Sequence, residues 1–246
     1  MQRILIVGAT SRIAEHCARL WARQPCRLVL AGRDIARLEN IAQDLRVRSP
    51  GSDIVCRTPS FEDPAAIDAF VREVFADGGV DVALVAHGNL PDQGRCQEDL
   101  ALVRAALEVN AVSPVLFAEA LAGAMQAAGR GSLAVIGSVA GDRGRRSNYV
   151  YGAAKGLVDR YLQGMQHRFA GGPVRVTIIK PGPTDTPMTE RLRSSGARLA
   201  DPARVAQDIC AGIASGKHVV YTPGIWRWIM LVIRHIPDRA FARLNI

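Results

Sequence analysis

The sequence is poor in cysteine, in aromatic residues and in clustered metal ligands. Its five cysteines include no Cys-x-x-Cys pair, and their odd number in a long chain argues against a disulfide framework and favours a reducing compartment. The five histidines are scattered, so we expect no metal site. Aromatic residues make up only 5% of the chain and no basic tract is concentrated, which argues against a nucleic-acid-binding module.

Long apolar runs are also missing. The N-terminal apolar run is too short for a signal peptide, and we expect that no stretch reaches the roughly 18 apolar residues of a spanning helix. We therefore expect a cytoplasmic protein. The net charge of +8 fits either an arginine-rich solubilising surface or attraction to an anionic ligand or membrane.

The 246 residues, 48% of them apolar, suit one large α/β domain. Short apolar segments alternate with helical patterns, and neither an internal repeat nor a linker rich in Gly, Pro or Ser divides them. The predicted strands cover residues 4–7, 28–31, 54–56, 80–86, 133–136, 174–179 and 219–221. The predicted helices cover residues 12–23, 34–45, 64–75, 100–125 (with a break near Pro114), 149–169 and 201–214, the last capped by Asp201.

This alternation predicts a doubly wound parallel sheet of about seven strands, the Rossmann fold, in a single domain. We assign residues 1–222 to the sheet and its helices, and residues 223–246 to an amphipathic tail of the same domain. Such sheets bind ligands beyond the carboxyl ends of their strands, so the search for chemistry begins there.

The first two predicted strands end in residues suited to a dinucleotide. Gly8 follows the first strand, and a tight turn there would aim the N–H groups of the next helix at a pyrophosphate. After the second strand stands Gly32, where NAD-binding folds usually carry a carboxylate, and Arg33 follows it. A guanidinium there suits the 2′-phosphate of NADPH, with help from Arg12. The alternative is two ordinary surface arginines, with Asp34 capping the next helix.

Tyr151 and Lys155 are four residues apart on a predicted helix, which places them on one face. A phenol is too weak an acid to work as a base at neutral pH, and a nearby ammonium would lower its pKa. Ser138, at the end of the fifth strand, could donate to a substrate carbonyl oxygen. Asn110, in the helical stretch after the fourth strand, is either part of this group or an ordinary buried amide.

Together these residues resemble the short-chain dehydrogenase/reductase family in order and spacing, over about residues 1–222. The resemblance implies that Tyr151 transfers a proton, Ser138 polarises the carbonyl, Lys155 tunes Tyr151 and holds the nicotinamide ribose, and Asn110 supports a water relay. Charge complementarity at Gly32 and Arg33 favours NADP(H) as the cofactor. The implied cofactor contacts are Gly8, Thr10, Ser11, Arg12, Ile13, Arg33, Ala86, Gly88, Tyr151, Lys155, Pro181, Gly182, Thr184 and Thr186.

Two motifs depart from the family pattern. The usual Gly-x-x-x-Gly-x-Gly reads Gly8, Arg12 and Ala14, and the usual Asn-Asn-Ala-Gly reads Val85-Ala86-His87-Gly88. The strings GATS-x-IA, AHGNLPDQ and YTPGIWRWIMLVIRHIP resemble a bacterial subgroup related to reductases of polyprenyl-phosphate-linked keto-pentoses. This narrower resemblance implies a lipid-linked keto-sugar as substrate, in place of a soluble carbonyl compound.

Several points remain open from the sequence. Substrate specificity is expected in residues 90–99, 141–148 and 188–200, where Arg143, Arg145 and Arg146 either receive an anionic substrate or form an exposed basic loop. Family resemblance implies a homodimer or homotetramer through the helices that hold residues 110–125 and 147–169. A second hypothesis for the whole chain is a sensor or regulatory protein that binds dinucleotide without turnover, since fold alone does not fix function.

The tail reads IWRWIMLVIRHI over residues 225–236, with Arg227 and Arg234 on a narrow polar stripe. One interpretation is a helix packed on the body of the domain. The other is an interfacial helix, apolar and aromatic with cationic anchors, which would give peripheral contact with the inner face of the membrane.

Overall fold

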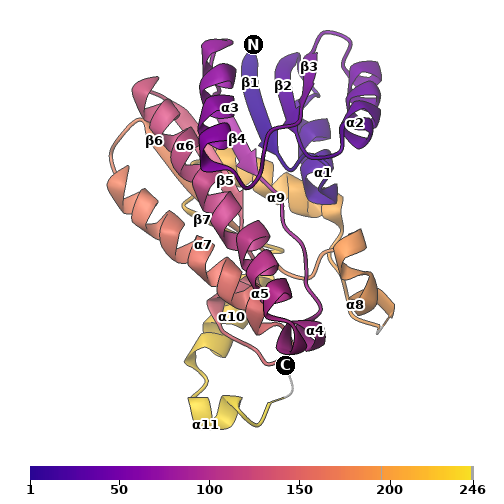
Figure 1. Ribbon diagram of the computed structural model, residues 1–246, viewed down its shortest axis with the longest axis vertical. Helices are drawn as coiled ribbons and strands as arrows, with labels where there is room; N and C mark the ends of the chain where they lie inside the picture. Colours follow the sequence, from indigo (N-terminus) through magenta and orange to yellow (C-terminus); the bar gives the residue numbers. More distant parts are fainter. Residues whose placement is uncertain (195, 245–246) are drawn as a thin grey trace.

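The computed structural model, in which residues 1–194 and 196–244 are described, contains one seven-stranded sheet (Figure 1). Its order is β3-β2-β1-β4-β5-β6-β7, and every neighbouring pair is parallel. The predicted doubly wound fold is therefore confirmed. The strands are β1 (Gln2–Val7), β2 (Cys26–Ala31), β3 (Asp53–Arg57), β4 (Val82–Val85), β5 (Gly131–Ile136), β6 (Val174–Pro181) and β7 (Val219–Thr222).

Helices cover both faces of the sheet, which is why its strands are nearly continuous apolar runs. In β1, Leu5 faces one core and Ile4 the other, and both are buried. The core around Leu5 is closed by α3 (Pro64–Ala76), α6 (Ser113–Ala127) and α7 (Tyr149–Arg168). The core around Ile4 is closed by α1 (Arg12–Trp21), α2 (Ile35–Arg48) and α9 (Pro202–Ala214).

Aspartates begin several of these helices, because a carboxylate satisfies the free N–H groups of a first turn. Asp201 accepts a hydrogen bond from the backbone N–H of Ala203 at 3.1 Å and Pro202 opens α9, as predicted. Asp34 caps α2 in the same way, through the N–H of Arg37 at 3.1 Å. Asp34 is therefore the N-cap of α2, as the alternative interpretation of this part of the sequence predicted.

The helix predicted over residues 100–125 is interrupted, and the interruption precedes Pro114. It consists of α5 (Leu100–Leu107), a π-helical turn η1 (Glu108–Val112) and α6. Asn110 lies in η1, where its amide donates to the carbonyl of Ala106. A polar side chain that competes for backbone groups is a recognised cause of such an irregularity.

The continuous stretch Leu100–Ala127 is long and apolar enough to cross a membrane by composition alone. The sequence prediction missed it because polar residues interrupt the run. Its inward side chains, among them Phe117, Leu121 and Met125, are fully buried on the sheet, as in the core helix of a soluble protein. Only 33% of its most apolar window is buried, however, and the large apolar side chains of Leu100 and Val112 are exposed.

The remaining segments are short and lie beyond the carboxyl ends of the strands. They are α4 (Gln93–Glu98), η2 (Val139–Asp142), η3 (Pro187–Thr189), α8 (Glu190–Ser194), α10 (Ile225–His235) and α11 (Asp238–Phe241). Figure 1 shows α10 and α11, in yellow, below the body of the domain. The tail thus folds as two helices next to the edge of the sheet where the ligand site is expected.

Candidate active site

A cavity of about 410 Å³ opens beyond the carboxyl ends of the strands, where ligands of doubly wound folds bind. It runs from the ends of β1 and β2 to the loops after β5 and β6. Fourteen of the predicted site residues line it: Gly8, Thr10, Ser11, Ile13, Arg33, Ala86, Gly88, Ser138, Tyr151, Lys155, Pro181, Gly182, Thr184 and Thr186. Arg12 and Asn110 do not line it.

Gly8 forms the tight turn predicted after β1. Its φ of +85° lies in the left-handed region, and a Cβ there would lie 2.5 Å from the backbone nitrogen of His87. Only glycine fits both the conformation and the space. The N–H of Ser11 donates to the carbonyl of Gly8 at 3.0 Å, and α1 begins at the next residue. Free N–H groups of α1 therefore face the cavity beside this turn.

Two arginines stand at the β2 end of the cavity. Arg33 is exposed and lines it as predicted, and Arg37, one turn into α2, lines it too. Arg12 instead pairs with Glu15 at 3.4 Å, with 49% of its side chain exposed. Arg37 was missed because helical periodicity alone does not show that α2 turns this residue toward the site.

Asn110 lies behind the cavity wall. Its Oδ1 accepts from the N–H of Asn89 at 2.9 Å, and its Nδ2 donates to Asn89 Oδ1 at 2.8 Å and to Ala106 at 2.9 Å. A side chain at Gly88 would lie 2.8 Å from Asn110 Oδ1 and 3.5 Å from Lys155 Nζ. Asn110 thus supports the Gly88 wall as a satisfied buried amide, and its part in a water relay stays a prediction.

Ser138, Tyr151 and Lys155 meet in the cavity. The hydroxyl of Ser138 also accepts from the N–H of Ala140 at 3.1 Å, which fixes its position at the start of η2. Lys155 is 3% exposed, and its ammonium donates to the carbonyl of Ile136 at 2.9 Å. The ammonium lies 5.8 Å from the centre of the Tyr151 ring. The predicted grouping of the three side chains is therefore present.

The electrostatics of the pair differ from the sequence expectation. Burial raises the pKa of Tyr151 to about 12, and a hydrogen bond with Ser138 offsets only part of this rise. Burial also lowers the pKa of Lys155 to about 8. The lowering of the Tyr151 pKa that the sequence predicted from Lys155 is absent, because burial disfavours the charged form of each side chain. At neutral pH this leaves Tyr151 protonated and Lys155 mostly charged.

His87 lines the cavity at a position where the family motif has alanine. Its Nε2 is 2.9 Å from the hydroxyl of Ser113, and its ring packs edge-on against Phe61 and Phe117. Burial, followed by the charges of Lys155 and Arg33, lowers its pKa to about 3. The imidazole is therefore neutral at working pH, and it fills space behind the turn at Gly8.

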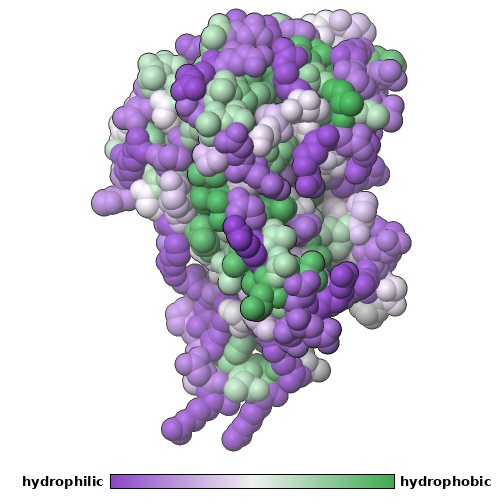
Figure 2. Space-filling view, in the orientation of Figure 1, coloured by the Kyte–Doolittle hydropathy of each residue, from purple (hydrophilic) through white to green (hydrophobic). Residues whose placement is uncertain are grey.

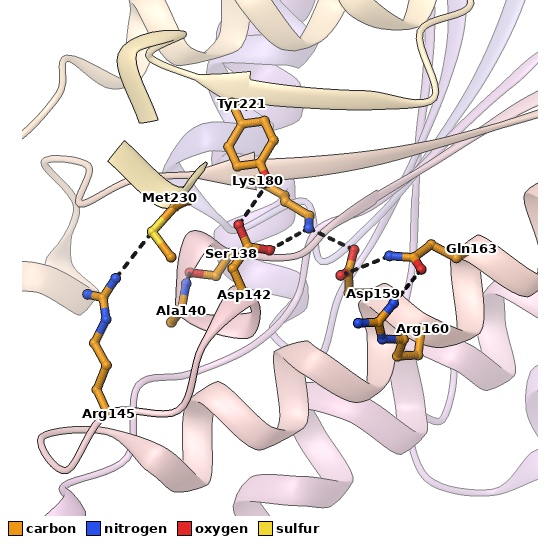
Figure 3. A network of polar contacts seen from close by, with 10 residues as sticks. All are labelled: Ser138, Ala140, Asp142, Arg145, Asp159, Arg160, Gln163, Lys180, Tyr221 and Met230. Carbon is orange, nitrogen blue, oxygen red and sulfur yellow. Dashed lines mark hydrogen bonds and ion pairs between the residues drawn. The ribbon is translucent and has the colours of Figure 1, made fainter. Parts of the chain in front are cut away.

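A buried cluster of charges that the sequence did not reveal joins the elements around the site (Figure 3). Lys180 Nζ lies 2.6 Å from Asp142 Oδ1 and 2.9 Å from Asp159 Oδ1, and the hydroxyl of Tyr221 donates to Asp142 Oδ2 at 2.8 Å. Burial alone would lower the pKa of Lys180, but its hydrogen bonds to the two carboxylates outweigh this and raise it. The four side chains tie η2, α7, β6 and β7 together directly behind Ser138.

The comparison with known proteins agrees with this geometry. The family model for short chain dehydrogenases matches residues 2–196. The chain belongs to the short-chain dehydrogenase family. It is 35% identical over 244 residues to an uncharacterized oxidoreductase of Mycobacterium tuberculosis, covering 98% of this chain and 96% of that protein. It is also 35% identical over 248 residues to an uncharacterized oxidoreductase of Streptomyces coelicolor, covering 99% and 96%.

The fold agrees with solved short-chain dehydrogenases. One from Sphingobium yanoikuyae, in complex with NADPH, superimposes with a TM-score of 0.81 at 22% identity, covering 97% of each chain. The chain is therefore an oxidoreductase of a family whose members bind a nicotinamide dinucleotide.

Proposed function

We propose that this short-chain dehydrogenase uses NADPH to interconvert a carbonyl compound and its alcohol, with Tyr151 as the proton-transferring residue. The observation that carries the proposal is that Ser138, Tyr151 and Lys155 share one cavity with the Gly8 turn and with the arginines that follow β2, Arg33 and Arg37. A protein that only sensed dinucleotide would not need all three polar groups at the substrate end. This arrangement favours turnover over the sensor alternative.

The residues present fit a nicotinamide dinucleotide. The Gly8 turn and the start of α1 offer N–H groups to a pyrophosphate, and Arg33 and Arg37 offer guanidinium groups to a 2′-phosphate. Asp34, the carboxylate next to Arg33, accepts a hydrogen bond from the N–H of Arg37 at 3.1 Å, and Glu62 is a further carboxylate on the cavity wall. The Sphingobium yanoikuyae relative, solved with NADPH, supports NADP(H) over NAD(H).

When bound, the coenzyme supplies or accepts the hydride, and the chain's own residues handle the substrate oxygen. Ser138 donates a hydrogen bond to that oxygen and holds it beside Tyr151. In reduction, Tyr151 is ready to donate because its raised pKa keeps the phenol protonated. The ammonium of Lys155, which lies 5.8 Å from the centre of the Tyr151 ring, then stabilises the phenolate that remains.

For the substrate we propose a lipid-linked keto-sugar, with the tail as a peripheral membrane contact. Support comes from the narrower sequence resemblance and from the outer face of α10, where Ile225, Trp228 and Val232 are 60%, 61% and 66% exposed. The other face of α10 packs on the body: Met230 is fully buried, and a side chain at Gly182 would overlap the Trp226 indole. The two interpretations of the tail are therefore compatible, because one face of α10 packs on the body of the domain while the other is free to contact a membrane.

We also propose that two or four copies of the chain associate through the long helices. Figure 2 shows apolar side chains gathered over α5, α6 and α7 on the face toward the viewer. Leu100 is 82% exposed there, and Tyr149, Leu157 and Tyr161 are exposed on α7. A contiguous apolar face of this kind typically marks an interface.

Turnover with a panel of carbonyl compounds tests the proposal. Keto-sugars, keto-lipids and simple ketones would be offered with NADPH and, in parallel, with NADH, while absorbance of the reduced coenzyme is followed. We expect oxidation of NADPH that depends on a ketone and exceeds that of NADH. NADPH binding without turnover of any ketone or alcohol in the panel would favour the sensor instead.

A further inference from the structure

The loop between η2 and α7 carries three arginines, and the structure gives them different surroundings. Arg143 is fully engaged by the tail: its Nη1 donates to the carbonyls of Ile233 and Ile236 at 2.8 and 2.6 Å. Its Nη2 pairs with Asp238 at 2.8 Å, and its guanidinium lies 3.9 Å from the Phe241 ring centre. Arg146 is exposed and is not part of the cavity wall. Only Arg145 of the three lines the cavity.

Arg145 enters the cavity with much of its hydrogen-bonding capacity unused. Its Nη2 lies 3.3 Å from the sulfur of Met230 (Figure 3), and a thioether is a weak acceptor. Its Nε is buried and has no partner among the residues that the structure describes. A guanidinium has five N–H donors, and leaving them without oxygen acceptors away from water costs free energy.

Nearby carboxylates do not relieve this charge. Asp142 is the one whose field acts on Arg145, but its two oxygens are already held by Lys180 at 2.6 Å and Tyr221 at 2.8 Å. Burial lowers the pKa of Arg145, with Asp142 opposing it only in part. The guanidinium therefore remains short of negative charge at the substrate end of the cleft.

Asn148 adds a second unmet group to the same wall. It lines the cavity three residues from Arg145, and its Oδ1 is buried with no partner in the described part of the chain. Arg33 and Arg37 follow β2, whereas Arg145 follows β5, and β1 and β4 lie between these strands. The two basic ends of the cleft are therefore separate, and Arg145 belongs to the end that holds Ser138 and Tyr151.

We propose that Arg145 forms an anion subsite, so that the substrate carries a carboxylate or phosphate group in addition to its reacting carbonyl. The inference rests on the proposed function, because it assumes that the carbonyl sits at Ser138 and Tyr151. A guanidinium binds two oxygens of either anion side by side. Asn148 Oδ1 accepts from a hydroxyl or N–H of the same ligand.

Matched substrate pairs test the subsite. Levulinate would be compared with methyl levulinate, and dihydroxyacetone phosphate with dihydroxyacetone, using the full chain and saturating NADPH. In wild type we expect a lower KM for at least one anion than for its neutral partner. Arg145→Met should raise that KM about 10- to 100-fold, the range for one charged hydrogen-bonding contact. It should leave the neutral KM unchanged.

Arg146→Met is the matched control, since it removes the same charge from the same loop but not from the cavity wall, and it should leave both values unchanged. If Arg145 merely supports α10 through Met230, methionine would preserve that apolar contact, and both KM values would stay at wild type. Equal KM values within each pair, or equal effects of Arg145→Met on both members, would overturn the subsite while leaving carbonyl reduction intact.

A binding measurement separates this failure from failure of the proposed function. The NADPH-loaded protein would be titrated by calorimetry with levulinate and with inorganic phosphate, in wild type and Arg145→Met. Weaker binding of either anion to the variant supports the subsite even if no ketone is reduced, which would contradict the function alone. Affinities that are the same in both proteins, or no binding of either anion, would contradict the subsite.

Discussion

The charges of single residues decide which coenzyme the cleft accepts. Arg33→Ala should weaken NADPH binding by about 1.5–3 kcal/mol, the scale of one hydrogen bond to a charged group, and should change NADH binding little. The reason is that only NADPH carries a 2′-phosphate for this guanidinium. Dissociation constants from fluorescence titration of both coenzymes check this. Equal losses for the two would mean that Arg33 holds the structure instead.

The buried ammonium of Lys155 should weaken folding. Its pKa falls from 10.5 to about 8 in the folded chain, so below pH 8 folding desolvates a charge at a cost of about 3 kcal/mol, and above about pH 10.5 this cost is gone. Its hydrogen bond to Ile136 returns about 1 kcal/mol. Lys155→Met should therefore be more stable than wild type by about 1–2 kcal/mol at pH 7.

Urea unfolding at pH 7 and pH 9.5 measures this directly. Raising the pH should stabilise wild type relative to Lys155→Met, because the wild-type lysine sheds its proton as pH passes its folded pKa. The difference in the free energy of unfolding between wild type and Lys155→Met should therefore become smaller or change sign at pH 9.5. A gap that does not change with pH would show that Lys155 keeps an ordinary pKa in the folded chain.

Residues of the site were predictable from sequence where local geometry fixes them. Tyr151 and Lys155 share a helix face because they are four residues apart, and Gly8 follows directly from a strand that ends in a tight turn. Arg37 and Lys180 could not be predicted in this way. Their roles depend on which neighbouring elements pack against them, and a single sequence does not contain that information.

At the level of elements, Lys180 joins β6 to η2 and α7 through two buried carboxylates. Lys180→Met should lower the free energy of unfolding by about 3–5 kcal/mol, because it leaves Asp142 and Asp159 buried without a counter-charge. The exposed pair of Arg72 and Asp68 on α3 offers a control. Arg72→Met should cost less than about 1 kcal/mol, and both are measured by urea denaturation.

Combining Lys180→Met with Asp142→Asn and Asp159→Asn should recover part of the loss, since the stranded charges are removed. If Lys180→Met costs no more than Arg72→Met, the cluster does not stabilise the fold.

The interruption in the long helix illustrates the same limit on what a single sequence predicts. The break predicted near Pro114 is present as the π-helical turn Glu108–Val112, but its form could not be predicted, because the amide bonds of Asn110 depend on Asn89 in a distant loop.

At the scale of the whole molecule, the seven-stranded parallel sheet was predictable because alternating short apolar strands and helices leave few other arrangements. Which side chains lie on the surface could not be predicted, since their exposure depends on how the helices and strands pack against one another. Within Leu100–Ala127, Leu100 and Val112 are exposed whereas Phe117 and Leu121 are buried, and the sequence does not separate these apolar positions. The same holds for the two faces of α10.

The exposed face of α10 should bind anionic membranes. Co-sedimentation with phosphatidylglycerol vesicles at low salt should pellet wild type, and a Trp228→Glu, Val232→Glu variant should stay in the supernatant. Both side chains are more than 60% exposed, so the variant should keep its fold and its activity toward soluble ketones. Leu100→Glu, on the α5 face, is the control and should still pellet. Wild type that remains soluble at low salt would contradict the membrane contact.

The central claim is that Tyr151 transfers the proton in a cavity that also holds NADPH. Tyr151→Phe removes only the hydroxyl, so its NADPH dissociation constant should stay within about twofold of wild type, while turnover of any ketone found in the panel should fall below about 1%. Fluorescence titration with NADPH gives the dissociation constant, and stopped-flow oxidation of the bound NADPH by the ketone gives the turnover rate. Turnover near the wild-type rate in this variant would contradict the account.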